Sequence, residues 1–436
     1  TAINPTMSGE HEIFLNFDRV PATQPGPNSP RVLIIGAGII GMSTAWTLLD
    51  RGYHVTVVAE NFATRDGKRL TSQIAGALWE YPPAVCGHTS NQTTLESSKR
   101  WSMVSYHVFK HMAADPVLAR DFKVQMRNTI FFFDKLVKSD PLQLHKMREI
   151  ERSGINGFRH DISVIHKVGI SEDKWKDAYE ILSPLIDTDA ALTEITRLVR
   201  EKGAKFENKR IDGDLIKQEK ELLEEYKAQA IVNATGLGAK VLANDQDVYP
   251  LRGAVLRLLN NGQKWRKIKD ALVVSATAEG HVETDFIFIV PRNDEILYVG
   301  GFSEPDNSNL NFDETDPKVR MIAKNAKEFL NALDTDYTDP AYPLAKGLRP
   351  ARKGDVRVER ELRKPNTGKG YSRIGHLYGH AGAGWSLSFG CALEVESLVA
   401  GAIAQEKPMK QDQSGSQVSA KQVRTFQDMT VDSSYD

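Results

Sequence analysis

The sequence predicts an α/β protein in which a parallel sheet flanked by helices is joined to a domain with a mixed, largely antiparallel sheet. Strand and helix signals alternate along most of the chain, and a glycine-rich turn separates the first strand from the first helix. Residues 255–305 are rich in short strands instead. The alternating part predicts the parallel sheet, and the strand-rich part predicts the antiparallel one.

The composition is that of a globular protein: 436 residues, 41% of them hydrophobic and 26% charged, with a net charge of −1. A nearly neutral chain argues against nucleic acid or an anionic membrane as a partner. We find no apolar stretch of about eighteen residues, the length of a membrane helix. Cys86 and Cys391 lie far apart, which favours neither a disulfide framework nor a metal site. We therefore expect an intracellular, soluble protein, and residues 434–436 carry no peroxisomal signal.

The first elements follow an N-terminal arm, residues 1–29, which holds few periodic apolar positions and is rich in Pro near its end. A β-rich run, 31–36, precedes a segment with helical spacing that ends at Gly52. The next strand is expected at 54–60. The later elements are a buried strand at 127–136, an amphipathic helix at 189–203, a solvated helix at 217–227, a strand at 228–236, a hairpin of 286–291 and 295–301, and a helix at 390–405.

A G-x-G-x-x-G motif, formed by Gly36, Gly38 and Gly41, lies between the first strand and the first helix. Its glycines permit a tight turn, a close approach of a pyrophosphate and close packing of helix on strand. The helix N-terminus then offers free N–H groups to the phosphates. Glu60 follows about twenty residues later, where a carboxylate accepts hydrogen bonds from a ribose 2′-hydroxyl and repels a 2′-phosphate. The motif predicts a dinucleotide other than NADP, and by itself it does not separate FAD from NAD.

Two further segments favour FAD. A strand ends at Thr235 and Gly236, in a turn where only small residues fit beside a cofactor. The glycine-rich loop at 378–384 runs into a helix whose N-terminus can stabilise negative charge on a reduced flavin. Nucleotide-type segments spread over the whole chain suit FAD, whose domain is assembled from discontinuous pieces.

Six ordered stretches carry a resemblance to a known family: 32–45, 71–82, 231–239, 249–258, 346–361 and 378–394. Over roughly residues 30–405 the chain resembles the D-amino-acid oxidases, which include the D-aspartate oxidases. The resemblance implies a Rossmann-type FAD-binding domain and a substrate domain. We assign the first to 30–95, 186–255 and 345–408, the second to 96–185 and 256–344, and a flexible tail to 409–436.

The resemblance also implies which residues contact FAD, including an Ala-Gly-Leu-Trp-type region that lines the flavin. The expected cofactor-binding residues are Gly36, Ala37, Gly38, Ile39, Ile40, Gly41, Glu60, Ser72, Gln73, Ala75, Gly76, Ala77, Leu78, Thr235, Gly236, Gly384, Trp385 and Ser386.

Two residues are expected to act on the substrate itself. In the family an arginine in a Gly-Leu-Arg-Pro-type segment binds the substrate carboxylate, and Arg349 matches it. A guanidinium pairs bidentately with a carboxylate and stays charged at every working pH. The alternative is a structural arginine in a loop. A glycine carbonyl of the C-terminal loop accepts a bond from the substrate amine in the family, and Gly382 matches it.

The predicted substrate pocket departs from the family. Two family tyrosines fall on Phe288 and Thr284, and Phe288 cannot donate a hydrogen bond. Losing a bond to a charged group costs about 1.5–3 kcal/mol if nothing replaces it. Either another residue replaces the tyrosine, with Tyr298 as a candidate, or the substrate is not an ordinary free D-amino acid. The simple alternative is that Phe288 is a core aromatic.

Glu80 and Trp385 complete the expected pocket. Glu80 stands where mammalian members often have glutamine, and it either attracts a basic group or accepts a structural hydrogen bond. Trp385 stands where members commonly have leucine. His380 lies in the same loop, as a packing residue or as a proton carrier.

The implied function is that of an FAD-dependent oxidase that deaminates D-amino acids, and the resemblance implies a homodimer, the common form in the family. The α-hydrogen leaves as hydride to flavin N5, water hydrolyses the imino acid to a 2-oxo acid and ammonia, and dioxygen becomes hydrogen peroxide. The same chemistry on an acidic D-amino acid, a secondary amine or a natural-product amine is the alternative. An acidic substrate needs a second cation, for which Arg257 or Arg292 is available. A non-catalytic FAD-binding partner protein is the alternative of another class.

Overall fold

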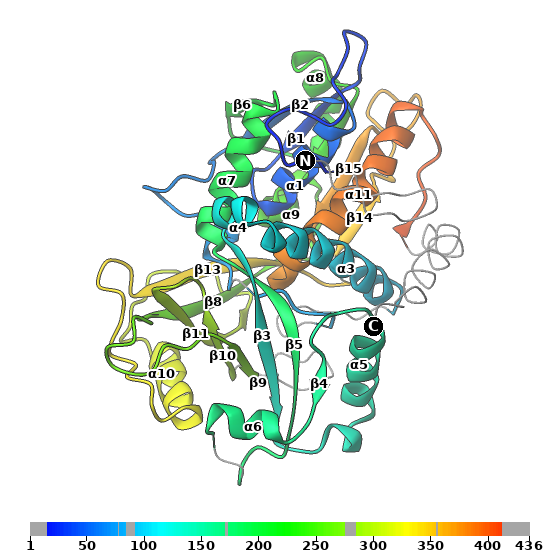
Figure 1. Cartoon of the computed structure of the whole chain (residues 1–436). Coiled ribbons are helices and arrows are strands. Elements are labelled where there is room, and N and C mark those ends of the chain that lie inside the picture. The colour runs from blue at the N-terminus through cyan, green and yellow to red at the C-terminus, as the bar shows by residue number, and fades with distance from the viewer. Residues whose placement is uncertain are drawn as a thin grey trace.

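The computed structural model describes residues 15–76, 78–83, 92–170, 173–274, 285–354 and 356–411. Two sheets organise them, one in the upper half and one in the lower half of Figure 1. Ala77 and Thr284, both expected at the site, lie outside the described residues.

The upper sheet has six strands in the order β14-β15-β7-β1-β2-β6. All neighbours run parallel except β14, which is antiparallel to β15. The bounds are β1 Arg31–Ile35, β2 His54–Ala59, β6 Lys205–Asn208, β7 Ala230–Asn233, β14 Arg357–Arg360 and β15 Ile374–Tyr378. Helices cover both faces of this sheet, so β1 is a continuous apolar run instead of an alternating one. The predicted Rossmann-type sheet is confirmed.

Five helices pack around this sheet. They are α1 Ile39–Asp50, α3 Gln92–Ala114, α7 Thr188–Glu201, α8 Leu215–Glu225 and α11 Gly384–Ile403. Both α1 and α3 pack against α11 (Figure 1). The stretch Ala381–Ile403 is long and apolar enough to cross a membrane, which corrects our expectation from the sequence, but most of it is buried inside the protein. This burial is typical of a helix in the core of a protein.

The lower sheet has nine strands in the order β12-β8-β11-β10-β9-β3-β5-β4, with β13 paired to β8. Its neighbours are antiparallel except for the parallel pair β3 and β9. The bounds are β3 Val124–Phe133, β4 Arg159–His160, β5 Asp177–Ile186, β8 Val248–Leu259, β9 Ala271–Val274, β10 Asp285–Pro291, β11 Ile296–Phe302, β12 Glu304–Pro305 and β13 Leu344–Arg352. The predicted hairpin is β10 and β11.

Three of the remaining helices share one start signal, an N-cap aspartate followed by a proline: Asp115, Asp140 and Asp316. The carboxylate accepts the free N–H groups of the first turn, and proline needs no partner there. The remaining helices are α2 Thr71–Ile74, α4 Pro116–Phe122, α5 Pro141–Arg152, α6 Ser163–Val168, α9 Ala239–Leu242, α10 Pro317–Phe329 and the 3₁₀ turns η1 Val137–Ser139, η2 Gly236–Gly238 and η3 Ala381–Ala383.

The domain boundaries differ from those expected. β8 and β13 pair along their whole length in the nine-stranded sheet, so the ends of 186–255 and the start of 345–408 belong to that sheet. α3 packs on α11, although most of it was assigned to the substrate domain. Pairing between strands about ninety residues apart leaves no trace in local periodicity, which explains the error.

The described part of the N-terminal arm is packed onto α1 instead of forming a free tail. Phe17 is buried edge-on against Trp46, with ring centroids 5.1 Å apart. Asp50, which is 1% exposed, accepts hydrogen bonds from the backbone N–H of Asn16 (2.7 Å), the Trp46 indole (2.9 Å) and the Lys202 ammonium (2.7 Å). One buried carboxylate therefore joins the arm, α1 and the end of α7.

We predict that Asp50→Asn lowers the free energy of unfolding by about 3–5 kcal/mol, because it leaves the Lys202 charge buried without its partner. Urea denaturation measures the change. The double variant Asp50→Asn/Lys202→Met is the control, and we expect it to be more stable than the single variant. A double variant as unstable as the sum of its two single changes contradicts the assigned coupling.

Candidate active site

The glycine motif forms a turn that no larger residue fits. Gly36 has φ of +110°, and a Cβ added there would collide with the carbonyl of Ala234, directly after β7. A Cβ on Gly41 would collide with the carbonyl of Gly36. The turn, the first helix and the neighbouring strand therefore meet at backbone distance, as a dinucleotide cradle requires.

Two helix N-termini meet beside this turn. A Cβ on Gly384, the first residue of α11, would lie 3.7 Å from Ile39, the first residue of α1. Ser72 links them, because its Oγ accepts the N–H of Ile39 (3.0 Å) and its carbonyl accepts the Trp385 indole N–H (2.8 Å). Both helix ends carry partial positive charge, so the pair favours an anionic group. Three segments that are far apart in sequence are thus brought together as expected.

The Thr235-Gly236 turn follows β7, next to the glycine-motif turn. The buried Asn233 accepts the Thr235 hydroxyl (2.7 Å) and lies 3.3 Å from the ring of His376 behind it. Gly236 has φ of +56°, and a Cβ there would touch Pro350 at 3.4 Å. The turn therefore lies directly against the residue that follows Arg349 in β13.

The segment from Gln73 to Leu78 crosses from one sheet to the other. Gln73 is fully buried and its amide donates to Asp189 (2.7 Å), so its side chain serves the protein interior. Gly76 makes room for Phe288, because a Cβ there would lie 2.8 Å from the phenyl ring. Leu78 forms a bridge with Leu185 of β5. Phe288 therefore packs on the segment expected to line the flavin. Its ring is in contact with a predicted cofactor-binding residue, Gly76, and not with core residues alone.

Two titratable residues bear on how well FAD fits. Glu60 follows β2 at the surface, where Arg210 lies 3.3 Å from its carboxylate. His380 is buried, and its Nε2 has no hydrogen-bond partner within the described part of the chain. Burial lowers the pKa of His380 to about 3, so the ring is neutral and unsuited to carry protons near pH 7. An unpaired buried nitrogen in this loop and a cradle free of Cβ atoms both fit a bound FAD.

Arg349 lies on β13 with its guanidinium over Gly253, where a Cβ would collide with it. Its nearest polar neighbours are the Phe302 carbonyl (3.4 Å) and the Ser303 hydroxyl (3.5 Å). Within the described ranges no carboxylate approaches it within 4.0 Å. Arg349 is therefore half-buried, charged and short of a counter-ion, as a substrate-binding arginine should be.

The other two candidate cations are already neutralised. Arg257 donates to Asp339 (3.0 Å) and to the Tyr298 hydroxyl (3.1 Å). Arg292 donates to Asp187 at 3.1 Å. Tyr298 is 1% exposed and lies within this arginine cluster, so its hydroxyl is engaged away from Arg349. None of the three is arranged to bind a second acidic group.

Arg292 has a role that sequence reasoning missed. Its two terminal nitrogens donate to the carbonyls of Ala75 (3.1 Å) and Gln73 (2.8 Å). The Thr188 hydroxyl lies 3.0 Å from both carbonyls as well. The segment expected to line the flavin is thus held by a buried arginine from the β10–β11 turn. The only hint in the sequence was an arginine directly after a buried strand.

Glu80 makes structural contacts inside the protein, the second of the two roles considered for it. Its carboxylate lies 3.1 Å from the ammonium of Lys146, which also donates to the Pro83 carbonyl (2.8 Å). The Glu80 N–H donates to the Ser386 hydroxyl at 3.3 Å. Lys146 already supplies the positive partner, so Glu80 is not a free carboxylate waiting for a basic substrate.

Comparison with known proteins agrees with this geometry. The sequence profile of the family described as FAD dependent oxidoreductase matches residues 31–398. The chain belongs to this family. It is 27% identical to a D-amino-acid oxidase of Rubrobacter xylanophilus, over 86% of this chain and 97% of that protein. FAD is accordingly the cofactor, and the protein is an oxidoreductase.

Solved structures share the fold. A glycine oxidase from Geobacillus kaustophilus superposes with a TM-score of 0.63 at 14% identity, covering 85% of this chain and 95% of that one. An L-alpha-glycerophosphate oxidase from Mycoplasma pneumoniae with FAD bound gives 0.62 at 16% identity, covering 88% and 96%. These enzymes act on different substrates, so the shared fold does not identify the substrate, which has to be argued from the site.

We predict that Gly41→Ala abolishes retention of FAD through purification, because the methyl group collides with the Gly36 carbonyl under the pyrophosphate site. The ratio of visible to ultraviolet absorbance measures FAD content. Gly26→Ala is the matched control, since a Cβ there has no atom within 4 Å. Equal FAD content in the two variants would argue against the assigned cradle.

Proposed function

We propose that the protein oxidatively deaminates D-amino acids to 2-oxo acids, ammonia and hydrogen peroxide. The observation that carries the proposal is Arg349, a guanidinium without a carboxylate partner in the described chain, in a strand whose next residue lies against the Gly236 turn. A planar carboxylate is the partner that such a fork accepts best.

The protein's residues would orient the substrate and the cofactor. Gly36, Gly38 and Gly41 would hold the pyrophosphate, and the N-termini of α1 and α11 would stabilise negative charge. When bound, FAD accepts the hydride from the substrate α-carbon and passes the electrons to dioxygen. Arg349 would bind the α-carboxylate, and the exposed Gly382 would accept a hydrogen bond from the amine through its carbonyl. This fixes the α-carbon between two anchors.

Phe288 has no donor to replace the hydroxyl of the family tyrosine. Ser303 lies 3.5 Å from the Arg349 guanidinium, and it is fully buried. We propose that Ser303 orients the guanidinium and that the substrate carboxylate is held by Arg349 itself.

The charges of the site favour a neutral side chain on the substrate. Arg257 and Arg292 are paired with Asp339 and Asp187, so an acidic side chain would find no free cation there. The Glu80 carboxylate is paired with Lys146. The second candidate substrate is glycine or a small secondary amine. The Phe288 ring packs on Gly76, so it would leave less room for a substrate side chain in the predicted pocket.

Anaerobic mixing tests the proposed activity. We expect a neutral D-amino acid to bleach the visible absorbance of the bound FAD, while its L-enantiomer, D-aspartate and N-methylglycine do not. D-aspartate bleaching faster than D-alanine would contradict the charge argument. Bleaching by none of these compounds would sink the proposal while leaving the family assignment untouched.

We predict that Arg349→Met raises KM for the D-amino acid about 10- to 200-fold, because losing a hydrogen bond between charged groups costs about 1.5–3 kcal/mol. Steady-state peroxide production measures the change. The exposed Arg320 on α10 is the matched control, and Arg320→Met should leave KM unchanged. A normal KM for Arg349→Met would make Arg349 a structural residue.

A further inference from the structure

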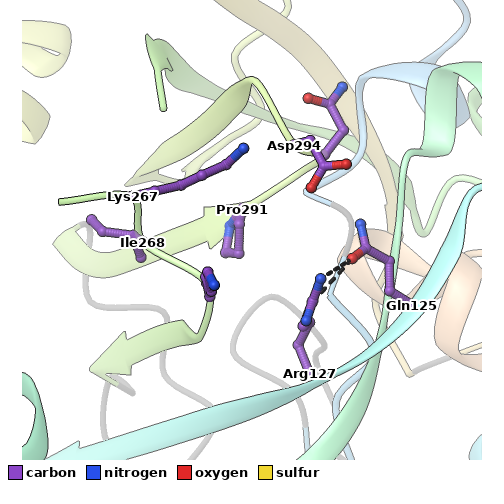
Figure 2. Close-up of a pocket in the computed structure, with 8 residues that line it drawn as sticks. Gln125, Arg127, Lys267, Ile268, Pro291 and Asp294 are labelled. Atoms are coloured by element: carbon purple, nitrogen blue, oxygen red, sulfur yellow. Dashed lines mark hydrogen bonds between the residues drawn. The ribbon is translucent and has the colours of Figure 1, made fainter. Parts of the chain in front are cut away.

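A second site lies at the far end of the nine-stranded sheet. A partly open cavity of about 300 Å³ is lined by the start of β3, the segment before β9 and the β10–β11 turn. Three cationic side chains line it: Arg127, Lys267 and Lys269. Figure 2 shows Arg127 and Gln125 rising from β3 opposite Lys267 and Asp294.

The cations of this cavity are unneutralised. No ion pair within 4.0 Å joins Arg127, Lys267 or Lys269 to a carboxylate in the described residues. Asp294 is the single acidic group in the lining, so the cavity has an excess of two positive charges. Arg257 and Arg292 each have an acidic partner, whereas these three cations share one pocket whose lining holds a single carboxylate, so the pocket favours an anion.

The cavity is built from fixed parts. Arg127 donates through Nε (3.0 Å) and a terminal nitrogen (2.6 Å) to the Gln125 amide oxygen, which orients the guanidinium and leaves its other donors free (Figure 2). The lysine segment is pinned at Ile268, whose N–H and C=O both bond the buried side chain of Asn260 (3.0 and 2.7 Å). Oriented donors lower the entropy cost of binding an anion.

This cavity is separate from the substrate site. Arg349 reaches the Phe302 carbonyl at the end of β11, whereas the cavity lies at the turn before β11 begins. A strand of this length spans about 20 Å. A ligand in the cavity therefore does not touch the carboxylate anchor.

The cavity wall is nevertheless connected to the flavin-lining segment. Asn293, which lines the cavity, donates to Asp187 at 2.9 Å, and Asp187 accepts from Arg292. Arg292 in turn holds the carbonyls of Gln73 and Ala75. A ligand that shifts Asn293 acts on the same hydrogen-bond chain that positions these carbonyls.

We propose that the cavity binds a phosphate dianion, free or as a small monoester, and that its occupancy is coupled to the FAD site through Asn293, Asp187 and Arg292. Two negative charges match the excess of two positive charges, and a tetrahedral oxyanion accepts hydrogen bonds from guanidinium and ammonium groups together. The volume exceeds that of phosphate alone, which leaves room for a small organic group.

Isothermal titration calorimetry of the FAD-loaded protein tests the site at constant ionic strength, with inorganic phosphate, ribose 5-phosphate and malonate as probes. We expect Arg127→Gln and Lys267→Gln each to raise the Kd for phosphate at least about tenfold. Lys264→Gln is the matched control, because Lys264 is exposed on the same segment outside the cavity lining. We expect its Kd to equal that of the unchanged protein.

Tighter binding of ribose 5-phosphate than of phosphate would identify the monoester as the ligand. Absence of phosphate binding, equal binding by the cavity variants, or binding of malonate alone overturns the proposal. The visible spectrum tests the coupling: saturating phosphate should shift the flavin bands, and should not do so in Arg127→Gln. No shift on binding overturns the coupling. None of these readouts requires turnover, so they stand apart from the proposed oxidase activity.

Discussion

The site depends most on the hydrogen bonds that Arg292 donates to the carbonyls of Gln73 and Ala75. The segment that carries these carbonyls also supplies Ser72 to the N-terminus of α1 and Leu78 to the edge of β5. This segment, which we call the strap, connects the two sheets. Without a buried donor, its carbonyls would lose hydrogen bonds inside the protein, which costs about 1–3 kcal/mol for each group.

An arginine suits this position better than a lysine. Its planar fork reaches two carbonyls and still offers Nε to Asp187, so one side chain satisfies three acceptors and keeps its charge paired. The conformation of the segment expected to line the flavin is therefore fixed by the protein itself, and Phe288 packs on this segment at Gly76. Preorganisation of this kind reduces what cofactor and substrate must order on binding.

The sequence predicted the elements that depend on neighbouring residues. The turn at Gly36, the parallel strands beside it and the β10–β11 hairpin all have short-range signals of glycine spacing and apolar runs. The strap could not be predicted, because Arg292 and Ala75 are separated by 217 positions. The same limit explains why the pairing of β13 with β8 and the Lys146 partner of Glu80 were not predicted.

The pairing of arginines also distinguishes structural from ligand-binding cations. Burying a charge is costly unless a partner neutralises it, and Arg257 and Arg292 meet this condition with Asp339 and Asp187. Arg349 and Arg127 have no carboxylate partner among the described residues, and Arg127 lines a pocket that a ligand can enter. They lie near opposite ends of β11: Arg349 reaches the Phe302 carbonyl at its end, and Arg127 shares a pocket with the turn before it. An anion at either place completes a charge pair that the protein alone leaves open.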